Sequence, residues 1–174
     1  MAQRGDKQTP YIRTGSFATM NEATLVRPGD LGMRTNGVQV KHQVVQLDSG
    51  ATAATPMGVV LATQTAYWKD RGAYLVTNDV RIAPGGISDP AGIFVGSVTA
   101  SNYTGVQTRG KCNVKCDGSA IVAGDFVIGN TSTPLGDVTR MAKGTAFTNP
   151  PFGEALGVPA SNVVSVYLNL PEVN

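Results

Sequence analysis

Residues 106–116 read Val-Gln-Thr-Arg-Gly-Lys-Cys-Asn-Val-Lys-Cys, and this stretch decides the fold class. Its even-numbered residues are apolar or small and its odd-numbered residues are polar or basic, so the two kinds alternate throughout. Successive side chains of a β-strand point to opposite faces of a sheet. The stretch therefore predicts a long antiparallel strand with one face on a core and the other in water.

Short strands and turns surround this segment. Asp117-Gly118 is a hairpin signal, and residues 120–128 are expected to return as the partner strand. Residues 138–141 form another short strand, whereas 68–72 are expected to be a loop. No window of ten or more residues fits the helical period of 3.6. The leading architecture is a small all-β sandwich or barrel.

The last strand is expected over residues 163–170, and its alternation directs four apolar residues inward. These four residues are Val164, Val166, Leu168 and Leu170. On the 106–116 strand, the outward basic residues are expected to form a solvated face that discourages edge-to-edge aggregation, with a binding patch as the alternative. They are Arg109, Lys111 and Lys115.

The first 36 residues differ from the rest of the chain. They are rich in Thr, Gly, Arg and Asn, and their scattered apolar residues follow neither the helical nor the strand period. From residue 37 onward the period of two begins, so we expect an extended arm at 1–36 and a β-domain at 37–174. The arm is either a loose terminus or a segment whose apolar side chains contact a partner. The expected anchors are Tyr11, Ile12, Phe17 and Leu25.

Composition argues against several function classes. The 174 residues carry a formal charge of only +2, which offers no strong electrostatic source of affinity for nucleic acid. One His and two Cys are too few for a multi-His or Cys/His metal centre, so no metal or other cofactor is expected. The lone His42 is expected to be a packed or rim residue. No apolar run approaches the length of a membrane span or resembles a signal peptide, so neither secretion nor membrane insertion is expected.

The two cysteines, Cys112 and Cys116, share one face of the predicted strand. Four residues of strand separate their Cα atoms by about 13 Å, whereas a disulfide requires about 4.4 to 6.8 Å. We expect two free thiols on the core face, which is consistent with synthesis in a reducing cytoplasm.

Residues 48–51, Asp-Ser-Gly-Ala, resemble the signature of retropepsin-like aspartic proteases, in which two subunits each supply an Asp and the pair shares one proton. That resemblance would make Asp48 catalytic. The alternative is ordinary turn chemistry, because Asp and Ser bond the local backbone and Gly accepts positive φ. The family's late Gly-Arg-Asn/Asp element has no equivalent after residue 130, so the expectation is that the protein is not an enzyme.

Three C-terminal segments share a recognisable order. They read Ile-Val-Ala-Gly-Asp-Phe-Val at 121–127, Phe-Gly-Glu-Ala-Leu-Gly at 152–157, and Val-Val-Ser-Val-Tyr-Leu at 163–168. This order resembles the capsid decoration, or cement, proteins of tailed bacteriophages. Their small β-domains often carry a Gly-Asp-x-Val strand, a Gly-x-Ala-Leu segment and a final Val-x-Val strand. The resemblance covers roughly residues 105–170 and, more loosely, 57–77.

The resemblance implies a structural virion protein on the outside of an icosahedral head, commonly a homotrimer, that clamps neighbouring major capsid subunits. It also implies that the N-terminal arm reaches onto those subunits, often by adding a strand. Another virion part, such as a tail tube, spike or head-tail adaptor, would share the same composition.

Overall fold

The computed structural model describes residues 31–32, 41–49, 59–80, 89–132, 135–146 and 149–171. Within these ranges the regular structure consists of β-strands without a helix, so the all-β prediction is confirmed. It follows that this part of the chain offers no helix able to cross a bilayer. The strands are β1 (Leu31–Gly32), β2 (Lys41–Leu47), β3 (Val59–Val60), β4 (Thr65–Asp70), β5 (Leu75–Thr77), β6 (Pro90–Phe94), β7 (Val98–Thr99), β8 (Tyr103–Lys115), β9 (Phe126–Gly129), β10 (Val138–Met141), β11 (Pro151–Ala155) and β12 (Val163–Asn169).

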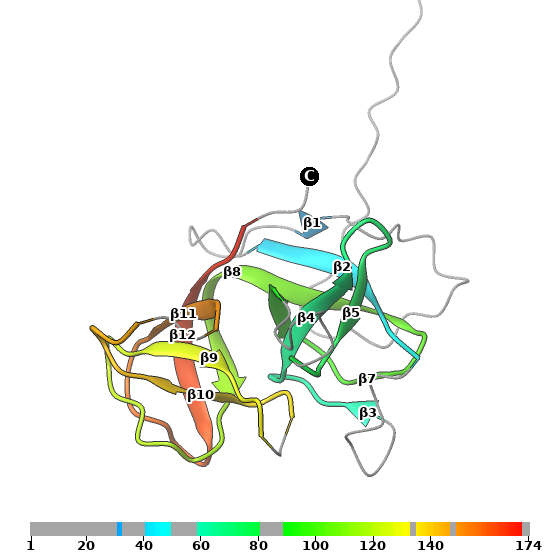
Figure 1. Ribbon diagram of the computed structural model, residues 1–174. Helices are drawn as coiled ribbons and strands as arrows, with labels where there is room; N and C mark the ends of the chain where they lie inside the picture. The colour runs from blue at the N-terminus through cyan, green and yellow to red at the C-terminus, as the bar shows by residue number, and fades with distance from the viewer. Residues whose placement is uncertain are drawn as a thin grey trace, which may run out of the picture.

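β8 is the long antiparallel strand that the alternating stretch predicts. Its first half pairs with β2 and, at Val106 and Gln107, with β6, while its second half pairs with β12. Gly110 lies between the two halves with a φ of 90°, which residues bearing a Cβ rarely adopt. β8 thereby belongs to two groups of strands, one that includes β2 and β6 and one that includes β12 (Figure 1).

The first half of the molecule is a closed five-stranded barrel. Its strands follow the order β2, β5, β4, β6 and β8, and pairing of β8 with β2 closes the ring. The small sheet of β3 and β7 contributes Val60 and Val98 to the apolar cluster inside. Gly92 permits a close approach of β6 to β8, because a Cβ there would lie 2.7 Å from the carbonyl oxygen of Gln107. The full cluster is Val45, Leu47, Val60, Ala66, Trp68, Val76, Ala91, Phe94, Val98 and Val106.

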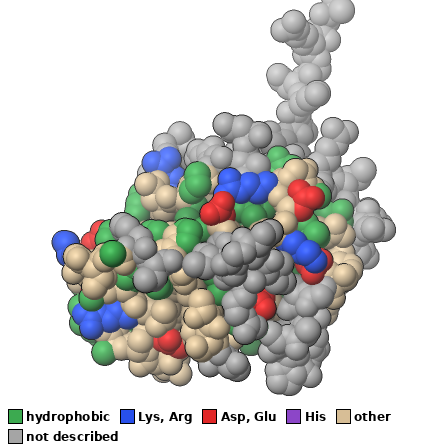
Figure 2. Space-filling view, viewed as in Figure 1, with side chains coloured by type: hydrophobic (Ala, Val, Ile, Leu, Met, Phe, Trp, Pro, Cys, Tyr) green, Lys and Arg blue, Asp and Glu red, His purple; other side chains and the backbone are tan. Residues whose placement is uncertain are grey.

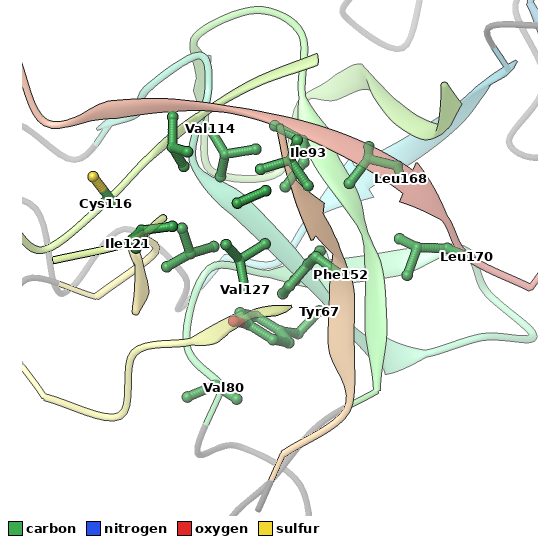
Figure 3. Packing of buried hydrophobic residues seen from close by; sticks show 14 residues of the cluster. Tyr67, Val80, Ile93, Val114, Cys116, Ile121, Val127, Phe152, Leu168 and Leu170 are labelled. Atoms are coloured by element: carbon green, nitrogen blue, oxygen red, sulfur yellow. The ribbon is translucent and has the colours of Figure 1, made fainter. Parts of the chain in front are cut away.

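The second half, called here the C-terminal lobe, consists of β12, β11, β9, β10 and the second half of β8. A parallel bridge between Cys116 and Val138 brings β10 back to the end of β8. Side chains from the lobe pack with Tyr67 of β4 and Ile93 of β6, so the lobe's core reaches the barrel (Figure 3). The buried members are Tyr67, Val80, Ile93, Val114, Cys116, Ile121, Val127, Val138, Phe152, Ala155, Val164, Val166, Leu168 and Leu170. The inward direction predicted for the four residues of the last strand is thus confirmed.

The predicted hairpin partner of β8 is wrong. Asp117-Gly118 does turn the chain, since Gly118 has a φ of 86° and the Ser119 amide donates to Asp117 Oδ1 at 3.0 Å. However, β9 begins only at Phe126 and pairs with β10 and β11, while β12 pairs with the second half of β8. A turn signal specifies a local reversal, whereas the burial of distant apolar residues selects the partner strand.

The loop predicted at residues 68–72 is also wrong in its first part. β4 extends to Asp70, and Trp68 is buried inside the barrel, where its ring meets that of Tyr74 edge-on at 6.3 Å. The charged residues that suggested a loop are exposed at the end of this strand and in the turn that follows it.

β8 is half-exposed only in its second part. From Thr104 to Thr108 every residue is buried, because strands pair on both sides and packing covers both faces. Gln107 is polar but buried, and its Nε2 donates to the carbonyl oxygens of Arg109 and Lys111, each at 3.0 Å. The alternation of the sequence could not reveal this second covered face.

Candidate functional site

The four expected arm anchors, Tyr11, Ile12, Phe17 and Leu25, lie outside the described residues. The nearest described segment is β1, within the stretch expected to be an arm. β1 pairs antiparallel with β2, with Leu31 opposite Gln43 and Gly32 opposite His42. The role of the anchors therefore stays a prediction.

Asp48 directly follows β2 and is tied to the barrel on two sides. Its amide donates to the carbonyl oxygen of Val76 at 2.8 Å, and its buried carboxylate meets the Lys69 ammonium at 2.8 Å. In a retropepsin-like pair, a second subunit would place its own carboxylate beside Asp48. In this chain the Lys69 ammonium lies beside the Asp48 carboxylate instead. The geometry favours a structural ion pair at the end of β2 and β4.

Cys112 and Cys116 are both free, and both belong to the core of the C-terminal lobe, as predicted. Burial raises the pKa of the Cys112 thiol to about 12 and also raises the pKa of Cys116. The thiolate is the form that attacks electrophiles and binds metals. Among the described residues, no group of three His, Cys, Asp or Glu side chains is placed to hold a metal ion. Burial likewise lowers the pKa of His42, which favours its neutral form.

The basic residues of β8 are separated by the fold. Lys111 is exposed and Arg109 is partly exposed, but Lys115 faces the buried Asp137, with Nζ and Oδ1 3.6 Å apart. Lys111 lies opposite Tyr167 of β12, which in turn lies opposite Glu154 of β11. The outer face of these strands therefore mixes both charges with an aromatic ring instead of presenting a continuous basic strip.

Several apolar side chains of the C-terminal lobe remain exposed. Val158, in the turn between β11 and β12, is the most exposed at 71%, while Val122, Leu156 and Tyr167 are nearly half exposed. The turn bearing Val122 is joined to the end of β11, because the Gly124 amide donates to the carbonyl oxygen of Ala155 at 2.9 Å. Figure 2 shows hydrophobic side chains distributed among polar and charged ones over one face of the molecule. Sequence alternation placed Tyr167 outward, but turn residues such as Val158 carry no such signal.

The three segments that resemble decoration proteins become neighbours in the fold. β11 lies between β9 and β12, with Glu154 opposite both Phe126 and Tyr167. Gly153 is required where these strands meet, because a Cβ there would clash with the backbone carbonyl oxygen of Tyr167.

Asp125 explains the Gly-Asp pair of the first segment. It is buried, and its Oδ2 accepts hydrogen bonds from the Val122 amide at 2.9 Å and from Arg140 Nε at 2.7 Å. The bond from the Val122 amide, with the Arg140 contact, lowers the pKa of this carboxyl group. Asp125 therefore joins the turn before β9 to β10.

Comparison with solved structures finds similarity to the crystal structure of the head fiber gp8.5 N base of bacteriophage phi29. The sequence identity is 16%, the match covers 78% of this chain and 99% of that chain, and the TM-score is 0.44. At this identity and TM-score the likeness carries no functional weight. No protein-family model matches the chain, and no curated protein does.

Proposed function

We propose that this protein is a structural part of a phage virion that binds the outer surface of the head. In this proposal it stabilises the capsid by clamping neighbouring major capsid subunits, as a homotrimer located on the capsid after synthesis in the host cytoplasm. The observation that carries the proposal is the resemblance of the 121–127, 152–157 and 163–168 segments to decoration proteins. Its structural support is that these segments meet around β9, β11 and β12 instead of being scattered over the surface.

A binding role fits the chemistry of the described residues. The carboxylate suggested as catalytic, Asp48, is paired with Lys69, and the thiols are in the core. A protein that binds only the assembled shell stabilises that shell by mass action, and several copies of the contact multiply a modest affinity. Exposed Val158, Leu156 and Tyr167 offer apolar contact area beyond the arm.

The arm can be tested in the full chain. Replacing Tyr11, Ile12, Phe17 and Leu25 by Ser should weaken cosedimentation with heads of the virus that encodes the protein by at least about tenfold, because each buried apolar side chain contributes about 1.5–3 kcal/mol. The matched control replaces Thr9, Thr14, Thr19 and Thr24 by Ser, which leaves the apolar anchors in place. Equal binding by the anchor variant and the wild type would refute the role of the arm.

Two further measurements separate the other functions considered. Labelled protein located on tails or at the head-tail joint by electron microscopy, and not on the head shell, would favour a tail or adaptor component. Peptide cleavage at mildly acid pH that disappears in Asp48→Asn would favour the protease. The proposal expects binding to the head shell and no activity that this substitution could remove.

A further inference from the structure

Besides the shared strand β8 and the meeting of the two cores, the segment Leu135–Asp137 forms a further contact between the barrel and the C-terminal lobe. It comes just before β10 and packs on residues 63–65, before and at the start of β4. The Thr65 amide and Thr65 Oγ1 both donate to the carbonyl oxygen of Gly136, at 2.7 and 2.9 Å. Gln64 Nε2 donates to the carbonyl oxygen of Leu135 at 3.2 Å. Gly136 has a φ of 87°, and a Cβ there would come within 3.0 Å of the Gln64 side chain. The joint is therefore a specific, closely fitted contact.

A carboxylate is buried inside this joint. Asp137 is 2% exposed, and its Oδ1 makes no hydrogen bond. The facing cation, Lys115 of β8, holds its Nζ at 3.6 Å from this oxygen, which is too far for a hydrogen bond. The backbone of Lys115 also belongs to the joint, since the Lys115 amide donates to the carbonyl oxygen of Thr63 at 2.9 Å.

The other titratable groups around Asp137 do not compensate for its burial. Asp117, in the turn after β8, adds a like charge, and Cys116 presents a neutral thiol because its pKa is raised. Burial is the largest influence on Asp137 and raises its pKa, while Lys115 and a hydrogen bond from the Gln64 side chain oppose the shift without cancelling it. An ionised carboxylate taken from water without full hydrogen bonding costs free energy.

We propose that Leu135–Asp137 is a proton-controlled latch that holds the C-terminal lobe against the barrel when Asp137 is protonated and loosens when Asp137 is ionised. The latch is a property of the fold, whichever partner the protein binds. The direction follows from linkage: opening returns Asp137 to water, where its ordinary, lower pKa applies, and so opening releases a proton. The closed latch is strongest below that ordinary pKa and weakens as pH rises through the raised pKa of the closed state.

Amide hydrogen exchange followed by NMR on the full chain tests the latch between pH 4 and 8, after correction for intrinsic exchange rates. The reporters are the amides of Thr65 and Lys115, which bond across the joint, and the references are those of Leu156 and Asp48, which bond within the lobe and the barrel. Protection of the reporters should fall with rising pH, by up to about tenfold per pH unit, and then level off. The references should not follow this fall.

Two substitutions and a control complete the test. In Asp137→Asn the reporters should lose their pH dependence and exceed wild-type protection at pH 7. In Lys115→Met, no cation opposes the raised pKa of Asp137, so the fall in amide protection should continue to higher pH. Asp89→Asn, in the exposed pair with Arg71, should behave as wild type. The latch is refuted if wild-type protection is constant or rises with pH, if Asp137→Asn lowers protection at pH 7, or if Asp89→Asn flattens the profile equally.

Discussion

At the scale of single residues, the barrel interior contains a hydroxyl group without a partner. Thr104 is fully buried, lies opposite Val45, and its Oγ1 makes no hydrogen bond. Opposed residues of an antiparallel pair point to the same face, so the hydroxyl lies among the apolar side chains of the barrel. Thr104→Val keeps the branched shape and removes this unmet polar group, and should raise the free energy of unfolding by about 1 kcal/mol. Urea unfolding at pH 7 measures the change.

A second buried threonine supplies the control for this prediction. Thr65 is equally buried, but its Oγ1 donates to the carbonyl oxygen of Gly136. Thr65→Val should therefore lower the free energy of unfolding by about 1 kcal/mol or more. If the two substitutions change stability in the same direction, hydrogen bonding of the hydroxyl is not what distinguishes the two positions.

At the scale of elements, the turn between β11 and β12 has a geometry that its residues only partly suit. Ala160 and Val163 exchange two backbone hydrogen bonds at 2.9 and 3.0 Å, and the intervening Ser161 and Asn162 have φ values of 51° and 59°. Two positive φ angles define a type I′ turn, for which Asn-Gly is preferred. The double change Ser161→Asn with Asn162→Gly should raise stability by about 1 kcal/mol, measured as an upward shift of the thermal midpoint.

The opposite substitution checks that this effect comes from the backbone. Asn162→Val places a β-branched residue at positive φ and should lower the thermal midpoint. The side chain of Asn162 is exposed, so loss of packing would not explain such a change. A midpoint unaffected by either variant would show that the turn does not limit stability.

The elements that the sequence predicted well are those with local alternation. The strand at residues 138–141 was predicted with the bounds found in β10, and the inward residues of β12 were predicted from a period of two. Strand partners were not predictable in this way, because Asp117-Gly118 specifies only a reversal and the core of the lobe decides which strand lies beside β8. Trp68 was missed because the charges that follow it indicated a loop, although its ring is in the barrel.

At the scale of the whole molecule, the sequence predicted the fold class but not the sharing of β8 between two halves. The uniform alternation of residues 106–116 gives no sign that Thr104–Thr108 are covered on both faces while the following residues are not. Of the candidate site residues, Asp48 was correctly placed at the end of a strand, but its Lys69 partner is distant in sequence and invisible to a motif. The apolar turn residue Val158 was missed because exposure in a turn depends on what packs around it.

The shared strand and the contact of the two cores suggest that both halves unfold together. Tyr67 of β4 and Phe152 of β11 meet edge to face, with ring centroids 5.3 Å apart, although they belong to different halves. Phe152→Ala should lower the free energy of unfolding by about 3–5 kcal/mol. The chain contains one Trp, and because Trp68 lies inside the barrel, its fluorescence reports on the half that does not contain Phe152. The Trp68 transition should shift by the same amount as the loss of β-structure followed by far-ultraviolet circular dichroism.

Val158→Ala provides the matched control for Phe152→Ala, since it also shortens an apolar side chain of the C-terminal lobe but at a 71% exposed position. It should leave both transitions within about 0.5 kcal/mol of the wild type. If Phe152→Ala shifts the circular dichroism signal while the Trp68 transition keeps its wild-type midpoint, the barrel unfolds independently of the lobe. One coincident transition would instead show that β8 and the Tyr67–Phe152 contact make the two halves a single cooperative unit.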